Sequence, residues 1–245
     1  MAPASAWATL RTWLRPAAAT CRPLPELPST SLPMPLHIPT VMLIAALSSA
    51  ATAIGLWVIA RAIRDDESLR IWARGASAVA MSYLLFILKG VLPDALTVVV
   101  ANVLMVGGHA QVWRGSLRFA GLPPRTAWEL AAAGVALVGS VWLTYLLPDQ
   151  PMRIVLISGV AAVFLLLNAV TLLRLRDAAL QALLRALGIG FAIYGTLIAL
   201  RAVLAPFTSV GQGMYGVSHE LLALAFTFTV VVHIFIAIGL VLLVA

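Results

Sequence analysis

The residues of this sequence that could do chemistry are the few polar and charged side chains inside its long apolar stretches. They are Lys89, Asn102, Glu129, Asn168, Arg201, Glu220 and His233. A polar group inside an apolar segment is unfavourable, so such residues usually face other helices and often bind a ligand or carry a proton. We therefore take them as candidate ligand-binding or structural polar sites.

Lys89, Asn102 and Arg201 are expected toward one end of the apolar segments that hold them. Two cations and an amide would form a vestibule there for an anionic or polar signal molecule, with Glu220 or Asp94 as the counter-charge. The alternative for Lys89 and Arg201 is structural, because long basic side chains can extend along a helix to the lipid headgroups.

Asn168 and Glu129 are expected in the opposite half of their segments, and His233 lies deep within the last one. The His233 side chain either makes a structural hydrogen bond or serves as a ligand or proton carrier. The pattern contains no paired carboxylates, no nucleophile with a base and no metal cluster within these segments, so we expect no enzymatic activity.

Neither a metal nor an organic cofactor is expected. Cys21 is the only cysteine, so the chain has no cysteine pair for a zinc or iron–sulfur site. His219 and His233 are 14 residues apart, which is about 21 Å along a helix axis and too far for both to bind one ion. Lys89 is the only lysine and lies in the second apolar segment, whereas retinal proteins carry their Schiff-base lysine in the last helix.

Two further motifs have structural explanations. Gly211, Gly213 and Gly216 match the spacing of a dinucleotide-binding fingerprint, but an apolar helix is predicted before them where that fingerprint needs a strand. We expect a flexible turn there, with Ser218 capping the helix that follows. The acidic triplet 65–67 is surrounded by arginines, which is typical of a solvated, charge-balanced turn.

The composition places the chain in a lipid bilayer. It is 62% hydrophobic and 10% charged with a mean hydropathy of +1.03, whereas about 25% of the residues of water-soluble domains are charged. Apolar runs long enough to span a bilayer occupy seven ranges: 39–60, 71–92, 95–113, 126–147, 153–173, 182–205 and 218–245. The predicted fold is an all-α integral membrane protein in which residues 39–245 form one domain of seven transmembrane helices.

The basic residues predict the orientation, because positive charge is retained on the cytoplasmic side. Ten arginines flank the breaks after the first, third and fifth runs: Arg61, Arg64, Arg70, Arg74, Arg114, Arg118, Arg125, Arg174, Arg176 and Arg185. Only Lys89, Arg153 and Arg201 flank the other breaks. This bias predicts an amino terminus outside and a carboxyl terminus in the cytoplasm. The net charge of +7 then reflects cytoplasmic loops rather than nucleic-acid binding.

Tryptophans and glycines supply two further expectations. Indoles concentrate at the membrane–water interface, and four are expected at the inner one: Trp57, Trp72, Trp113 and Trp128. Five glycines would either allow close helix contact or only lower the packing density: Gly107, Gly108, Gly188, Gly190 and Gly195.

Residues 1–38 do not fit the membrane domain. They are rich in proline and lack apolar periodicity, so they are predicted to be a disordered tail. Arg11 and Arg15 interrupt any apolar core of a signal peptide. The alternative is a mis-assigned start, with translation beginning at Met34.

Several short runs resemble one family. Gly90 to Asp94, the pair Ala101-Asn102, the pair Gly107-Gly108 and the run from Arg114 to Gly121 are similar to the membrane region that precedes GGDEF diguanylate cyclase domains in many bacteria. The resemblance implies a part that senses or anchors, joined to a cytoplasmic domain that makes cyclic di-GMP. The printed sequence contains no cyclase signature, so no catalytic residue is carried over.

The predicted function is therefore that of a sensory or anchoring module of a bacterial signalling protein, in the inner membrane and without its output domain. Its expected partners are the lipid bilayer, a cytoplasmic signalling domain or protein at the carboxyl terminus, and a second copy in a homodimer. Nucleic acid is not among them. The alternative is a small-solute transporter or channel-like protein, which favours an internal repeat or helices broken at the midplane, and the sequence has no clear repeat.

Overall fold

A computed structural model describes residues 38–63, 66–207 and 230–243, except positions 233, 237 and 241. The chain divides into the units Met1–Met34 and Pro35–Ala245, and every described residue belongs to the second. The predictions for the amino-terminal tail, the 211–216 glycine motif, Glu220 and His233 lie outside the described residues.

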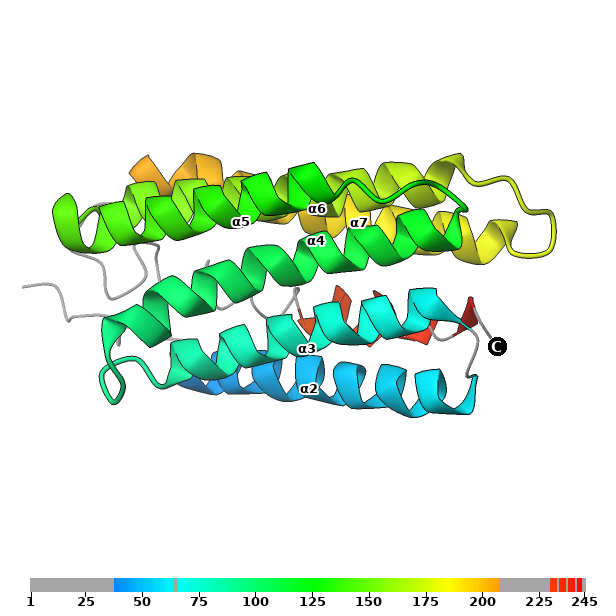
Figure 1. Ribbon diagram of the computed structural model, residues 1–245, viewed down its shortest axis with the longest axis horizontal. Helices are drawn as coiled ribbons and strands as arrows, with labels where there is room; N and C mark the ends of the chain where they lie inside the picture. The colour runs from blue at the N-terminus through cyan, green and yellow to red at the C-terminus, as the bar shows by residue number, and fades with distance from the viewer. Residues whose placement is uncertain are drawn as a thin grey trace, which may run out of the picture. The chain divides into compact units, whose positions relative to one another are not determined.

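All the elements of the described residues are helices (Figure 1). They are α2 (Ile38–Ala62), α3 (Glu67–Ile87), η1 (Ala95–Val100), α4 (Ala101–Phe119), α5 (Thr126–Val141), η2 (Trp142–Leu146), α6 (Gln150–Arg174), α7 (Gln181–Leu204) and η3 (Ala205–Phe207). The π-helical turns η1 and η2 continue directly into α4 and out of α5. A shorter apolar helix, Val230–Leu240, follows.

Five helices of the described part are long and apolar enough to cross a membrane. They correspond to α2, η1 with α4, α5 with η2, α6, and α7 with η3. The predicted all-α membrane class is confirmed at this level. α3 falls short of such a span, because it carries Arg70 and Arg74 in its first turns. The seventh predicted segment is described only from residue 230 onward, where Val230–Leu240 is a shorter apolar helix.

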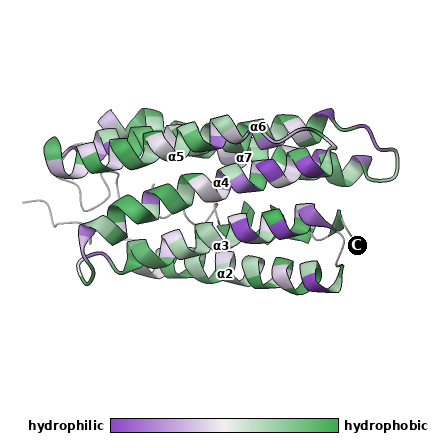
Figure 2. Cartoon of the chain, in the orientation of Figure 1, coloured by the Kyte–Doolittle hydropathy of each residue, from purple (hydrophilic) through white to green (hydrophobic). Residues whose placement is uncertain are grey.

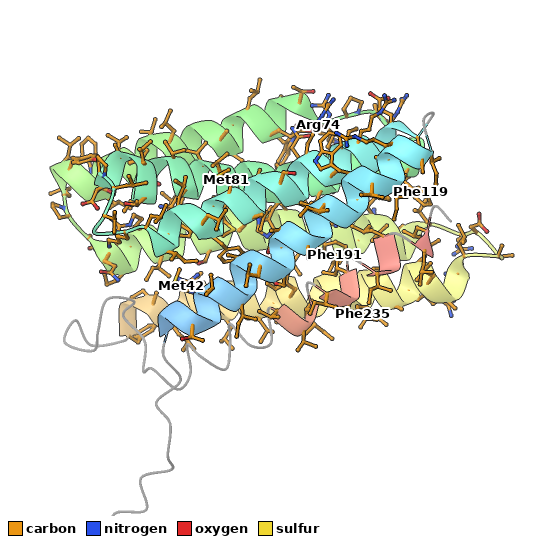
Figure 3. The ribbon with its side chains drawn as sticks, turned by 90° about the horizontal axis from the view of Figure 1, so that it is seen from below. Met42, Arg74, Met81, Phe119, Phe191 and Phe235 are labelled. Atoms are coloured by element: carbon orange, nitrogen blue, oxygen red, sulfur yellow. The ribbon has the colours of Figure 1, made fainter. Side chains whose placement is uncertain are left out.

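The helices run up and down, joined by short connections (Figure 1). α3 packs between α2 and α4, while α6 packs against both α7 and α4. The connections after α2, α4 and α6 therefore share one end, which we call the arginine-rich end, and those after α3, α5 and α7 share the opposite end. Figure 2 shows hydrophilic residues concentrated where α3 begins and α4 ends, and Figure 3 shows Arg74 and Phe119 at this same end.

The boundaries of α3 differ from the predicted 71–92. The helix begins earlier because the Asp66 carboxylate accepts hydrogen bonds from the backbone N–H groups of Ser68 and Leu69, at 2.7 and 3.3 Å. It ends at Ile87, so Lys89 lies in the turn that follows rather than on the helix. Asp66 of the acidic triplet thus supplies a helix cap.

The third predicted segment ends too early. α4 continues from the predicted end at Trp113 to Phe119, so Arg114 and Arg118 lie on the helix and not in the break. The carboxylate of Glu67 pairs with Arg118 at 2.8 Å. Nothing interrupts the helix before Gly121, whose φ of +69° ends it.

Two of the four tryptophans expected at the inner interface are buried inside the bundle, while their depth in the membrane stays a prediction. Trp72 is fully buried, and its indole N–H lies 3.1 Å from the Val112 carbonyl oxygen and 3.3 Å from the Ser116 hydroxyl. Trp113 is also buried and donates to the Thr171 hydroxyl at 3.2 Å. Both indoles join helices in the bundle interior. Charge predicts a residue's depth in the membrane, but it does not predict which face of the helix contacts a neighbour.

Most of the predicted glycines are closely approached. A Cβ added to Gly108, Gly188, Gly190 or Gly195 would lie within 2.6–3.2 Å of an atom of a neighbouring helix. Gly107 has open space at the same position. Close helix contact is therefore confirmed for four of the five glycines.

Candidate functional site

Polar side chains from three helices meet inside the bundle toward the opposite end. Tyr194 and Arg201 lie on α7, about two turns apart and therefore on one face. Tyr83 comes from the last turns of α3, and Ser158 lies in the third turn of α6. We call Tyr83, Ser158, Tyr194 and Arg201 the Arg201 cluster.

The members of the Arg201 cluster interact with one another. The side chains of Tyr83 and Tyr194 lie close enough to interact, and Arg201 acts electrostatically on both. The guanidinium of Arg201 donates to the Ser158 hydroxyl at 3.5 Å. Tyr83 and Tyr194 are only 5% and 2% exposed. Two phenol groups are thus buried beside a partly buried cation, and electrostatic interactions are stronger in such an interior than in water.

An imidazole extends the cluster toward α4. The His109 ring lies 6.1 Å from that of Tyr194, centroid to centroid. Its Nδ1 lies 2.7 Å from the Met105 carbonyl oxygen, which can only accept, so Nδ1 carries the proton. In the neutral ring Nε2 is then an acceptor. Polar groups therefore continue from Ser158 on α6 through α7 to α4.

The three predicted vestibule residues have different surroundings. Asn102 is buried and donates to the Ser140 hydroxyl of α5 at 3.2 Å. Arg201 bonds Ser158 of α6, and Lys89 lies in the turn after α3. Asn102 and Arg201 are thus held by different helices. A vestibule shared by all three stays a prediction.

Glu129 and Asn168, the other polar candidates of the described part, lie at helix interfaces. The Glu129 carboxylate is buried and pairs with Arg114 at 3.2 Å. Asn168 is 1% exposed, and its amide nitrogen and oxygen have no hydrogen-bond partner among the described residues. Asn168 is therefore a buried polar group that nothing in the described chain satisfies, which is rare in folded proteins.

Sequence reasoning did not connect Tyr83, Tyr194 or His109 with Arg201. The spacing of Tyr194 and Arg201 on one helix face was the available signal, but it does not indicate that Tyr83 joins them. Within residues 38–63, 66–207 and 230–243, no group of three His, Cys, Asp or Glu side chains could hold a metal ion.

The Arg201 cluster carries chemical groups that suit the binding of a ligand. It offers a guanidinium and hydroxyl donors, which together recognise a carboxylate or another anionic or polar group. Comparisons of the chain with protein-family models, curated proteins and solved structures found no match.

Proposed function

We propose that this chain is the sensory or anchoring module of a bacterial signalling protein of the cyclic-di-GMP type. It would cross the inner membrane seven times, with its amino terminus outside and its carboxyl terminus in the cytoplasm. Its partners would be a cytoplasmic output domain or protein and a second copy of the chain. The distribution of arginines between the two ends of the bundle supports this orientation.

The observation that carries the proposal is the packing of residues 230–243 against α7, the helix of the Arg201 cluster. A Cβ on Gly190 would lie 3.2 Å from the Phe235 ring, and Leu187 fills the space beside Gly239. Leu240 shares a buried core with Leu187 and Tyr194. A shift of α7 can therefore reach the last described segment through the contacts of Gly190 and Leu187.

This packing supports a mechanical form of signalling. An anionic or polar molecule bound at Arg201 would favour one arrangement of α7 over another, because the ligand binds the two arrangements with different affinity. Since the last segment packs on α7, its position would follow. An output domain attached beyond it would receive the change as a shift in helix position.

The experiment is a fusion of the whole chain to a diguanylate cyclase catalytic domain, with cyclic di-GMP measured in cells. Tyr194→Phe and Arg201→Gln remove a hydroxyl and a charge from the cluster. We expect each to change the output at least about fivefold, the lower end of typical allosteric coupling. The direction depends on which arrangement is active.

The matched controls make the same chemical changes elsewhere. Tyr145→Phe alters an exposed tyrosine in η2, and Arg185→Gln alters an exposed arginine at the other end of α7. Neither should change the output. Equal output from all the fusions at equal protein level would contradict sensing through the Arg201 cluster, leaving a passive anchor or a transporter.

A further inference from the structure

A groove of about 450 Å³ opens at the arginine-rich end between α4, α5 and α6. Its lining combines aromatic, aliphatic and basic side chains, chiefly Trp113, Leu117, Leu122, Arg125, Trp128 and Arg174. None of the residues in the Arg201 cluster contributes to it. The groove is therefore a separate candidate site.

The two arginines of the groove carry uncompensated charge. Two other arginines at this end are paired, Arg114 with Glu129 and Arg118 with Glu67. Arg125 and Arg174 are exposed and form no ion pair with any residue of the described ranges. No carboxylate is among the groove-lining residues. The groove is thus complementary to an anion.

The rest of the groove lining is suited to contact with a hydrocarbon chain. The polar groups of its floor are already satisfied, because Trp113 donates to Thr171 at 3.2 Å and Thr171 donates to the Leu167 carbonyl at 2.7 Å. The exposed surface nearby is apolar, since Val170 is 43% and Trp128 58% exposed. An exposed tryptophan beside arginines at a helix end is typical of the membrane–water interface.

We propose that this groove binds an anionic phospholipid, with the phosphate between Arg125 and Arg174 and an acyl chain along Leu167 and Val170. Guanidinium groups recognise phosphate oxygens by charge and by directed hydrogen bonds. Basic pockets between helices at the membrane surface bind lipid headgroups in this way. The orientation under Proposed function would place the lipid in the cytoplasmic leaflet, but the binding itself requires no signalling activity.

The test uses the quenching of tryptophan fluorescence by lipids with brominated acyl chains. The full chain is placed in phosphatidylcholine vesicles that contain brominated phosphatidylglycerol or brominated phosphatidylcholine. One basic residue near a membrane surface favours an anionic lipid about fivefold, so two predict a preference of about 25-fold for phosphatidylglycerol. Arg125→Gln and Arg174→Gln should each lower this preference about fivefold.

Two further variants locate the lipid. Trp128→Phe should remove most of the quenching that depends on phosphatidylglycerol, because Trp128 is the exposed indole of the groove. Arg176→Gln makes the same charge change at an exposed residue outside the groove and should leave the preference unchanged. The arginines are exposed, so each variant should keep the wild-type melting temperature.

Three outcomes would overturn the proposal. Equal quenching by the two lipids would indicate unspecific annular lipid. An equal loss with Arg176→Gln would indicate general attraction of charge. Displacement of phosphatidylglycerol by millimolar inorganic phosphate would identify a site for a soluble anion. Because cyclic di-GMP is not measured, failure here leaves the cyclase-fusion result unaffected.

Discussion

Gly75 of α3 and Gly108 of α4 pack directly against each other. A Cβ on Gly75 would lie 2.8 Å from the Gly108 carbonyl oxygen, and one on Gly108 would lie 2.9 Å from that of Gly75. The two backbones are therefore in contact, as is typical where small residues meet between membrane helices. The crossing also helps to position the candidate site, because Tyr83 follows Gly75 by about two turns and His109 follows Gly108 directly.

Gly108→Ala should destabilise the protein by about 2 kcal/mol, because the added methyl group meets rigid backbone and forces α3 and α4 apart. The free energy of unfolding can be measured in detergent micelles. Gly107→Ala is the matched control: its methyl group enters open space, so stability should stay the same or rise slightly. Equal destabilisation by both substitutions would show that the close contact is absent.

Arg114→Gln should lower stability by about 3 kcal/mol, because it leaves the buried Glu129 carboxylate without its cation. The double variant with Glu129→Gln should recover most of this loss. The comparison is Arg118→Gln, whose pair with Glu67 has side chains 59% and 54% exposed and should contribute less than about 1 kcal/mol. A similar loss of stability in both arginine variants would show that the difference in burial does not set the contribution of the two ion pairs.

Asn168→Leu should leave stability unchanged or raise it by about 1 kcal/mol, since the substitution removes buried polar atoms that have no partner in the described chain. Asn102→Leu should instead lower stability by about 1 kcal/mol, because the Ser140 hydroxyl loses its donor. Thermal unfolding of the two variants separates these expectations. If Asn168→Leu is the more damaging, Asn168 binds a group from outside the described chain.

Single cysteines test the orientation after the native Cys21 is replaced by serine. Val91 is 80% exposed in the connection between α3 and η1, and Leu122 is 48% exposed in the connection between α4 and α5. A membrane-impermeant maleimide added to intact bacterial cells, after permeabilisation of the outer membrane where one is present, should label Val91→Cys. Leu122→Cys should be labelled only after lysis. The reverse pattern would contradict a cytoplasmic arginine-rich end.

The amino-acid sequence alone determined the helical membrane class and the separation of arginines between the two ends. Both depend on local properties. A backbone in hydrocarbon must satisfy its own hydrogen bonds, so a long apolar run predicts a helix. Pro and Gly predict where it stops, although side-chain capping by Asp66 began α3 earlier than hydropathy indicated.

Tertiary structure alone decided which residues meet. In a membrane helix most faces are apolar, so hydropathy does not distinguish the face toward lipid from the face toward another helix. For that reason the sequence did not indicate that Trp72 is buried between helices. For the same reason Tyr83 was not connected with Tyr194. The two tyrosines lie on helices far apart in the sequence, and only the tertiary fold brings them close enough to interact.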